Sequence, residues 1–168
     1  APPGRFLYFQ LLDQDKKMVQ SMRSGVIIHP GETNGCIGCH EDRLSAPVNL
    51  NRMPMALQSM PYVLGEPPEE SFSYMKEVQP VFDRHCIACH DFGKTAGEYL
   101  VLSGDRNPYF NASYVDLHVK GMVSCVGGGP AEIQQAYSWG SHQSRLIEVL
   151  ENGHHEVLLS TEEMETLY

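Results

Sequence analysis

Two copies of one short pattern constrain this chain more than any other feature. Each copy reads cysteine, two other residues, cysteine and histidine, at residues 36–40 and 86–90. Two thiols at this spacing can form thioethers with the vinyl groups of a porphyrin, and the histidine that follows can bind its iron. The pattern therefore predicts two covalently bound haem c groups. The predicted attachment residues are Cys36, Cys39, Cys86 and Cys89, with His40 and His90 as iron ligands.

Three other kinds of protein site also contain paired cysteines and are alternatives to haem. A four-thiolate zinc site usually separates its pairs by about 15–20 residues, whereas 46 residues lie between Cys39 and Cys86. A four-thiolate zinc site also does not require a histidine directly after each cysteine pair. A thioredoxin-like redox site needs surrounding strands and helices in alternation, and neither copy has them. A pair of disulfides is the third alternative, and the repeated histidine favours haem over all three.

Charge and hydropathy exclude several classes of protein. The net charge is −9, and the acidic excess lies in residues 61–168, which carry six basic and sixteen acidic side chains. This surface argues against a nucleic-acid partner and favours a basic redox partner protein, although it also serves solubility. The sequence has no run of about 18 apolar residues, which predicts no membrane span. Because haem is attached in this way outside the cytoplasm, we expect an exported protein, periplasmic or extracellular.

Local patterns predict a mainly α fold with long loops and a small N-terminal β-hairpin. Residues 6–12 and 18–28 are rich in β-branched, aromatic and other apolar side chains, and they are the predicted hairpin strands. Apolar residues at helical spacing predict a helix over 71–84, in which Pro80 either makes a kink or starts a short helix. Residues 91–130 show little periodicity, which favours loops.

Further signals predict two helices near the end of the sequence and a boundary in its middle. The pattern over 141–150 predicts a helix that stops at Gly153, and residues 160–163 form a capping box for a short last helix. Five prolines within residues 45–70 favour an extended linker. The predicted units are a first haem module, residues 1–65, and a second haem module, residues 66–168.

The second half resembles a class I cytochrome c. In that family a helix leads into the haem motif, and the sixth iron ligand lies on a loop before a final helix. The predicted helix over 71–84 and the closing run Asn152–Met164 match this plan. Many members have a methionine in the ligand loop, whereas this sequence has Gly153 and His154 there. The resemblance therefore implies His154 as the second iron ligand of haem 2, with His155 as the alternative.

A larger part of the chain resembles a narrower group. The segments that carry the likeness are Tyr8–Asp13, Gln20–Ser24, Pro30–Glu32, Cys36–Glu41 and Tyr74–Cys86. They are similar to the dihaem region of the hydrazine synthase alpha subunit and of related multidomain proteins of planctomycete-type bacteria. This resemblance implies a dihaem domain within a longer parent protein, and it adds an anammox-type compartment to the expected locations.

The same resemblance bears on activity. In the hydrazine synthase subunit the first haem is catalytic, and a tyrosine shortly after the motif histidine is its ligand. In this sequence the run after His40 contains no tyrosine before Tyr62. The resemblance therefore supports a dihaem architecture more than it supports hydrazine chemistry.

The second iron ligand of haem 1 is predicted to be His29. This residue precedes Cys36 by seven positions and lies on a Pro-Gly turn, so the chain can reverse direction there. Seven extended residues reach at most about 25 Å, so the distance is not limiting. Several other ligands stay open at this point. They are Met53, Met55 and Met60 for haem 1, His118 and His142 as ligands or propionate partners, and His85 at the haem edge or in solvent.

The fifth cysteine, Cys125, belongs to neither motif. Its neighbours are valines, glycines and a serine, so we expect a small apolar residue in the interior. A disulfide between subunits is the alternative.

Together these observations favour single-electron transfer between two haems and an external partner protein. Two alternatives stay open. Haem 1 could keep an open position and react with a small nitrogen or oxygen species, or the dihaem block could be a repeating unit of a filament or a docking domain of a larger enzyme. No residue is assigned a catalytic role in the favoured interpretation.

The duplicated motif makes a first prediction. The mass of the denatured protein should equal the mass of the chain plus two haem groups, because thioethers survive denaturation. Intact-protein mass spectrometry measures this directly. A mass with only one haem, or with none, would contradict the prediction.

Overall fold

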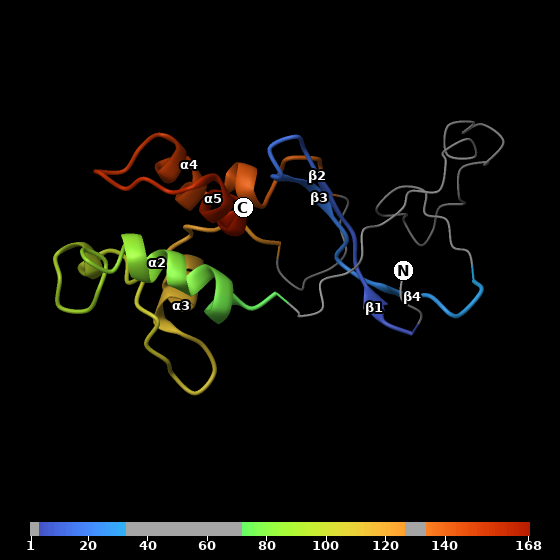
Figure 1. Cartoon of the computed structure of the whole chain (residues 1–168), viewed down its shortest axis with the longest axis horizontal. Helices are drawn as coiled ribbons and strands as arrows, with labels where there is room; N and C mark the ends of the chain where they lie inside the picture. Colours follow the sequence, from blue (N-terminus) through green and yellow to red (C-terminus); the bar gives the residue numbers. More distant parts are fainter. Residues whose placement is uncertain (1–3, 33–71, 127–133) are drawn as a thin grey trace.

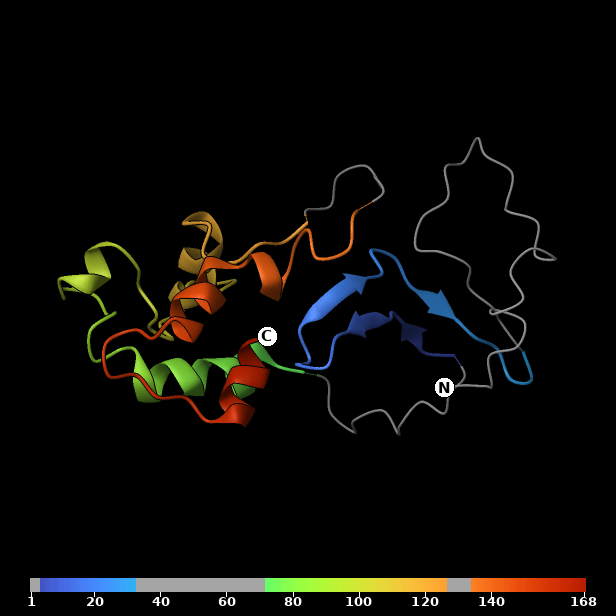
Figure 2. The same cartoon turned by 90° about the horizontal axis from the view of Figure 1, so that it is seen from above.

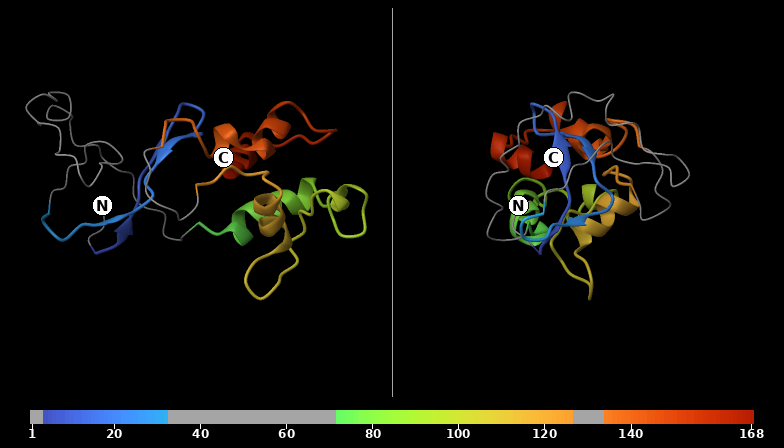
Figure 3. Two further views of the ribbon diagram at one scale, coloured as in Figure 1. Left: turned by 180° about the vertical axis from the view of Figure 1, so that it is seen from behind. Right: turned by 90° about the vertical axis from the view of Figure 1, so that its right-hand side faces the viewer.

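The structure is a computed structural model that describes residues 4–32, 72–126 and 134–168. Strands gather at one end of the described part and helices at the other (Figure 1, Figure 3). The strands are β1 (Phe6–Leu7), β2 (Gln10–Leu12), β3 (Met18–Ser21) and β4 (Val26–Ile27). The α-helices are α2 (Gln79–His85), α3 (Ala112–Val119), α4 (Arg145–Glu151) and α5 (Thr161–Leu167). Shorter helical turns are η2 (Tyr74–Val78), η3 (Ala96–Glu98) and η4 (Ser141–Gln143).

The predicted N-terminal hairpin is present. Strand β2 pairs antiparallel with β3, and β1 pairs antiparallel with β4 further from the turn. Asp13 closes the turn, because its Oδ1 accepts hydrogen bonds from the backbone N–H groups of Asp15 at 3.0 Å and Lys17 at 2.9 Å. Lys16 takes a left-handed conformation with φ of 62°. An aspartate that bonds to the backbone two residues ahead is a common way to reverse a chain.

The predicted helix over 71–84 is present in two parts. Residues 74–78 of η2 form a wider π-helical turn, and α2 continues from Gln79 to His85. Pro80 lies in the first turn of α2, where its missing N–H group costs no hydrogen bond. Pro80 thus lies where the helical run changes from a π-helical turn to an α-helix, in the first turn of α2 but with helical backbone before it.

The last two helices also follow the sequence pattern. Helix α4 begins after the short turn η4, and Gly153 follows it with φ of +83°, a conformation that glycine adopts without strain. At the start of α5 the Ser160 side chain accepts a hydrogen bond from the N–H of Glu163, whose side chain accepts one from the N–H of Ser160. This is the predicted capping box.

Helix α3 is the main element that the sequence did not predict. It occupies Ala112–Val119, within the run expected to form loops. Val115, Leu117 and Val119 alternate with other residues, a spacing typical of a strand, and only Leu117 of the three is buried. The helix is held by contacts of Ser113 and Leu117 with the rest of the protein, and a local pattern does not contain those contacts.

One hydrophobic core joins the helices. It consists of Val78, Phe82, Leu100, Leu102, Leu117 and Leu146. Phe82 is the most buried of them, at 1% exposure. Cys86, the first cysteine of the second motif, packs against this cluster. In Figure 2 the helix pair η2 and α2 lies beside α5, which agrees with the contacts between them.

Charged contacts attach the hairpin to the C-terminal helices. His142 donates a hydrogen bond from Nε2 to Asp13 at 2.8 Å, and the Lys16 ammonium lies 2.7 Å from the Glu165 carboxylate. Lys17 forms an ion pair with Glu151. The hairpin therefore packs on the second half of the chain through its turn.

The first motif, the proline-rich run 45–70 and the boundary between the predicted modules lie outside the described residues. Within the described ranges, no helix is both long and apolar enough to cross a membrane.

Replacing Phe82 with alanine tests the core. We expect Phe82→Ala to lower the free energy of unfolding by about 3–5 kcal/mol, because it leaves a cavity among packed side chains. Tyr99→Ala is the control: Tyr99 is 74% exposed, and its loss should change stability by at most about 0.5 kcal/mol. Denaturant unfolding measures both, and equal effects of the two changes would contradict this placement of the core.

Candidate functional site

The second motif continues the chain directly from α2. The N–H of Cys86 donates to the carbonyl of Phe82 at 2.8 Å, and the N–H of His90 donates to the carbonyl of Cys86 at 2.9 Å. The N–H of Cys89 also donates to the Cys86 carbonyl, at 3.1 Å. These bonds wind residues 86–90 into a compact turn that carries two cysteines and one histidine within five residues. Cys86 and Cys89 are free thiols, not a disulfide.

The two thiols have different surroundings. Cys86 is half-buried, and burial raises the pKa of its thiol to about 11, so the neutral thiol predominates near pH 7. Cys89 is exposed. Between them, the carbonyls of Ile87 and Ala88 accept hydrogen bonds from the Lys94 ammonium at 3.1 Å and 2.8 Å. Lys94 thus places a positive charge beside the motif.

His90 is oriented by the backbone of a neighbouring segment. Its Nδ1 lies 3.0 Å from the carbonyl oxygen of Leu100, and its own carbonyl accepts a hydrogen bond from the N–H of Leu102 at 2.8 Å. A carbonyl can only accept, so Nδ1 must carry the proton. The lone pair of the ring is then on Nε2, which is the usual arrangement for a histidine that binds a metal.

Two further side chains hold the segment that orients His90. Asp116 on α3 accepts a hydrogen bond from the N–H of Val101 at 2.8 Å, and Gln79 on α2 donates one to the carbonyl of Leu102 at 3.0 Å. Gln79 is only 2% exposed. The amide oxygen of Gln79 accepts hydrogen bonds from Asn111 at 2.8 Å and Ser113 at 2.6 Å. Helices α2 and α3 therefore both support the position of His90.

His154 faces His90 from the loop that follows α4. The centroids of the two rings are 5.8 Å apart, and the ring planes meet at 40°. Both neighbours of His154 have left-handed backbone conformations, with φ of 83° at Gly153 and 51° at His155. The N–H of Val157 donates to the His154 carbonyl at 3.1 Å and closes the turn.

The spacing of the two rings fits a metal held between them. A metal with an imidazole nitrogen about 2 Å away on each side separates the ring centroids by roughly 6 Å. The pKa of His154 is lowered, chiefly by burial and further by the nearby charges of His155 and His90. A lowered pKa favours the neutral imidazole, the form that binds metals.

Two histidines alone do not make a site for a free metal ion. The described residues contain no group of three or more His, Cys, Asp or Glu side chains that could hold one. A haem needs fewer protein ligands, because its porphyrin nitrogens bind the iron in the ring plane and leave only two axial positions. The donor set of His90, His154, Cys86 and Cys89 therefore fits a covalently attached haem better than a bare metal ion.

The structure places the other histidines of the described ranges against groups other than His90, or at the surface. His155 is exposed, and its ring contacts the edge of His154 at 4.6 Å between centroids. His118 lies on α3 and bonds to the carbonyl of Tyr114 at 2.8 Å. His142 bonds to Asp13, and His85 bonds to Glu163 at 3.0 Å. His29 is exposed at the surface. Of the predicted ligands in these ranges, His154 is the one whose ring contacts that of His90.

Some predictions are wrong or fall outside the described residues. Cys125 was expected in the interior, but it is exposed, whereas Met122 and Val123 of the same segment pack against the core. The residues assigned to haem 1 that lie outside the described ranges are Cys36, Cys39, His40, Met53, Met55 and Met60. The sequence also gave no sign that Leu100, Asp116 and Gln79 would support His90, since their contacts join distant segments.

Comparison with known proteins finds similarity at one end of the chain. Residues 1–41 match the family model described as the hydrazine synthase alpha subunit middle domain. The match covers the hairpin and the whole first motif, and it ends before the second motif. No curated protein matches the chain, and no solved structure matches it.

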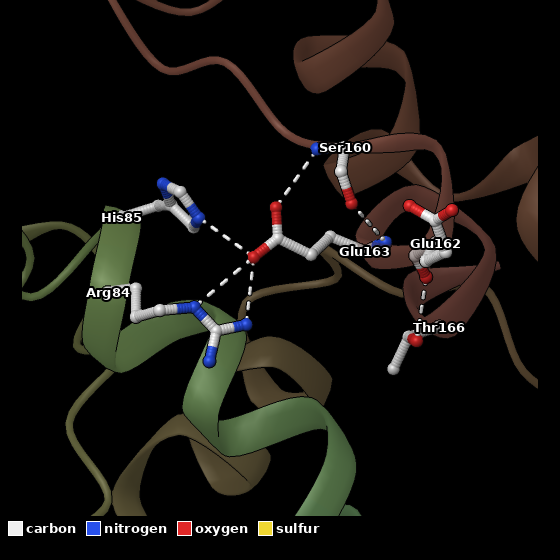
Figure 4. A network of polar contacts seen from close by, with 6 residues as sticks. All are labelled: Arg84, His85, Ser160, Glu162, Glu163 and Thr166. Carbon is white, nitrogen blue, oxygen red and sulfur yellow. Dashed lines mark hydrogen bonds and ion pairs between the residues drawn. The ribbon is translucent and has the colours of Figure 1, made fainter.

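A carboxylate joins α2 to α5 close to the second motif. Oε1 of Glu163 accepts hydrogen bonds from Nη2 of Arg84 at 2.8 Å and from Nε2 of His85 at 3.0 Å (Figure 4). Its Oε2 accepts one from the N–H of Ser160 at 2.9 Å. The hydrogen bond from Ser160, with those from Arg84 and His85, lowers the pKa of Glu163 to about 2.

This carboxylate makes folding stability depend on pH. Its folded-state pKa of about 2 lies below the ordinary 4.5, so its contribution is complete above about pH 4.5 and is lost as the pH falls towards 2. Glu163→Gln should therefore lower the melting temperature at neutral pH and have less effect in acid. Thermal unfolding followed by circular dichroism across this pH range measures the difference. The exposed Glu148 on α4 supplies the control Glu148→Gln, and an equal pH-dependent loss there would contradict the assignment.

Proposed function

We propose that this chain is a dihaem c-type cytochrome that transfers single electrons between its two haems and a redox partner protein. The observation that carries the proposal is the His90–His154 pair. His90 follows Cys89 directly in the sequence, and its ring centroid lies 5.8 Å from that of His154. The repeated motif of the sequence supports a second haem of the same kind.

Each residue of the proposed sites has a separate task. Cys86 and Cys89 attach haem 2, while His90 and His154 bind its iron; Cys36, Cys39 and His40 do the same for haem 1, with His29 as its second axial ligand. A haem held in this way supplies a one-electron couple between ferric and ferrous iron. The chain contributes orientation, since His90 is fixed by Leu100 and Leu102.

The surroundings of the second motif suit an electron-transfer site. Cys86 packs on the core, which keeps that side of the motif away from water. Cys89 is exposed, so the opposite side of the motif is open to an approaching protein. The acidic excess of residues 61–168 would attract a basic partner, and this attraction would weaken as the salt concentration rises.

A second function is favoured by one observation. The stretch that matches the hydrazine synthase alpha subunit middle domain contains the first motif. Haem 1 is therefore the place where catalysis on a small nitrogen species would occur, if the chain shares that activity. Low-temperature EPR of the oxidised protein separates the two functions: electron transfer predicts two low-spin haems, and catalysis at haem 1 predicts one high-spin haem.

Replacing His154 tests the proposed site directly. His154→Ala should convert haem 2 from low spin to high spin and let it bind carbon monoxide or cyanide readily, because one axial position becomes free. His155→Ala should leave the low-spin spectrum unchanged, since the His155 side chain is exposed. Absorption and EPR spectra of both variants report the result. A low-spin spectrum that survives in His154→Ala and is lost in His155→Ala would assign the ligand to His155 instead.

A further inference from the structure

One carboxylate links the two segments that carry the facing histidines. Arg84 and His85 are the last residues of α2, directly before Cys86, and both donate to Oε1 of Glu163. Arg84 makes two contacts with this oxygen, from Nε at 3.2 Å and from Nη2 at 2.8 Å. The Glu163 side chain is only 18% exposed. The hydrogen bonds to Oε1 of Glu163 therefore hold the end of α2, directly before the turn that begins at Cys86.

The hydrogen bonds between Glu163 and Ser160 hold the end of the loop that carries His154. Oε2 of Glu163 accepts the N–H of Ser160 at 2.9 Å, and Oγ of Ser160 accepts the N–H of Glu163 at 3.2 Å. The loop between α4 and α5 carries His154 and ends at Ser160. Figure 4 shows Glu163 between the end of α2 on one side and Ser160 on the other.

We propose that Glu163 is a positioning residue that holds the His154 loop against the segment carrying His90. This inference rests on the proposed function, because that function gives the His90–His154 pair its role as axial ligands. Without the carboxylate the loop keeps its sequence and its ligand, but it loses the contact that limits its movement away from α2. His154 then leaves the iron more often.

A purely structural role for Glu163 makes a different prediction. As part of a capping box it stabilises the first turn of α5, and loss of the cap alone would lower the melting temperature without affecting His154. Glu163→Gln separates the two roles, since glutamine also serves in capping boxes but cannot form the ion pair with Arg84. Glu163→Ala removes both. Arg84→Gln removes the ion pair and leaves the capping box in place.

The experiment measures how often His154 leaves the iron. Carbon monoxide is added to the reduced full-length protein in a stopped-flow instrument, because it binds ferrous iron only after an axial ligand has dissociated. The variant His154→Ala identifies which kinetic phase belongs to haem 2. Glu163→Gln and Arg84→Gln should each make that phase severalfold faster. Glu148→Gln, which removes the same charge from an exposed side chain on α4, should leave it unchanged.

The double variant and the melting temperature complete the test. Glu163→Gln combined with Arg84→Gln should be no faster than the faster single variant, because both changes remove one contact. If Glu163→Gln and Arg84→Gln lower the melting temperature but leave the haem 2 phase unchanged, the positioning role is wrong and the proposed function stands. If His154→Ala accelerates no phase, His154 is not a ligand, and the positioning role is overturned together with the assignment of His154 in the proposed function. Should Glu163→Gln fail to fold, Arg84→Gln alone decides the matter.

Discussion

The burial of the Leu100–Leu102 segment is the constraint on which the arrangement of the helices depends. Its three side chains are among the most buried in the described ranges, so its backbone polar groups also lie away from water and need partners. His90 supplies two of these partners, and Asp116 and Gln79 supply two more. The hydrogen bonds that orient His90 therefore also supply partners to polar groups of a buried backbone. Because the ring would lose its hydrogen bond to Leu100 if it turned, its orientation is fixed.

Some of this arrangement could be predicted from the sequence because its causes are local. The hairpin turn depends on Asp13 and its next few residues, the capping box on residues 160–163, and the helix stop on Gly153. Helix α3 could not be predicted, since Ser113 and Leu117 are buried only when α2 is present. The same holds for the buried amide of Gln79. Apart from Asp83, four residues along the helix, its partners are more than twenty residues away in sequence, and no local pattern points to them.

Neighbouring histidines in the ligand loop show how backbone conformation selects a side chain. His154 and His155 are chemically identical, and His154 was preferred because it follows Gly153 at the ligand position implied by the resemblance to class I cytochrome c. In the structure both Gly153 and His155 have positive φ, so the chain turns sharply on each side of His154. A left-handed histidine is uncommon and slightly strained, and here it accompanies a half-buried His154 and an exposed His155.

The two facing histidines are held by different kinds of interaction. His90 is fixed by hydrogen bonds to buried backbone, which solvent and salt affect little. The loop that carries His154 is tied to α2 by an ion pair between Glu163 and Arg84, whose side chain is 55% exposed, and such contacts are weaker and are screened by salt. The His90 side of the site is therefore held more firmly than the His154 side. Any opening should begin with the His154 loop, while His90 stays with the core.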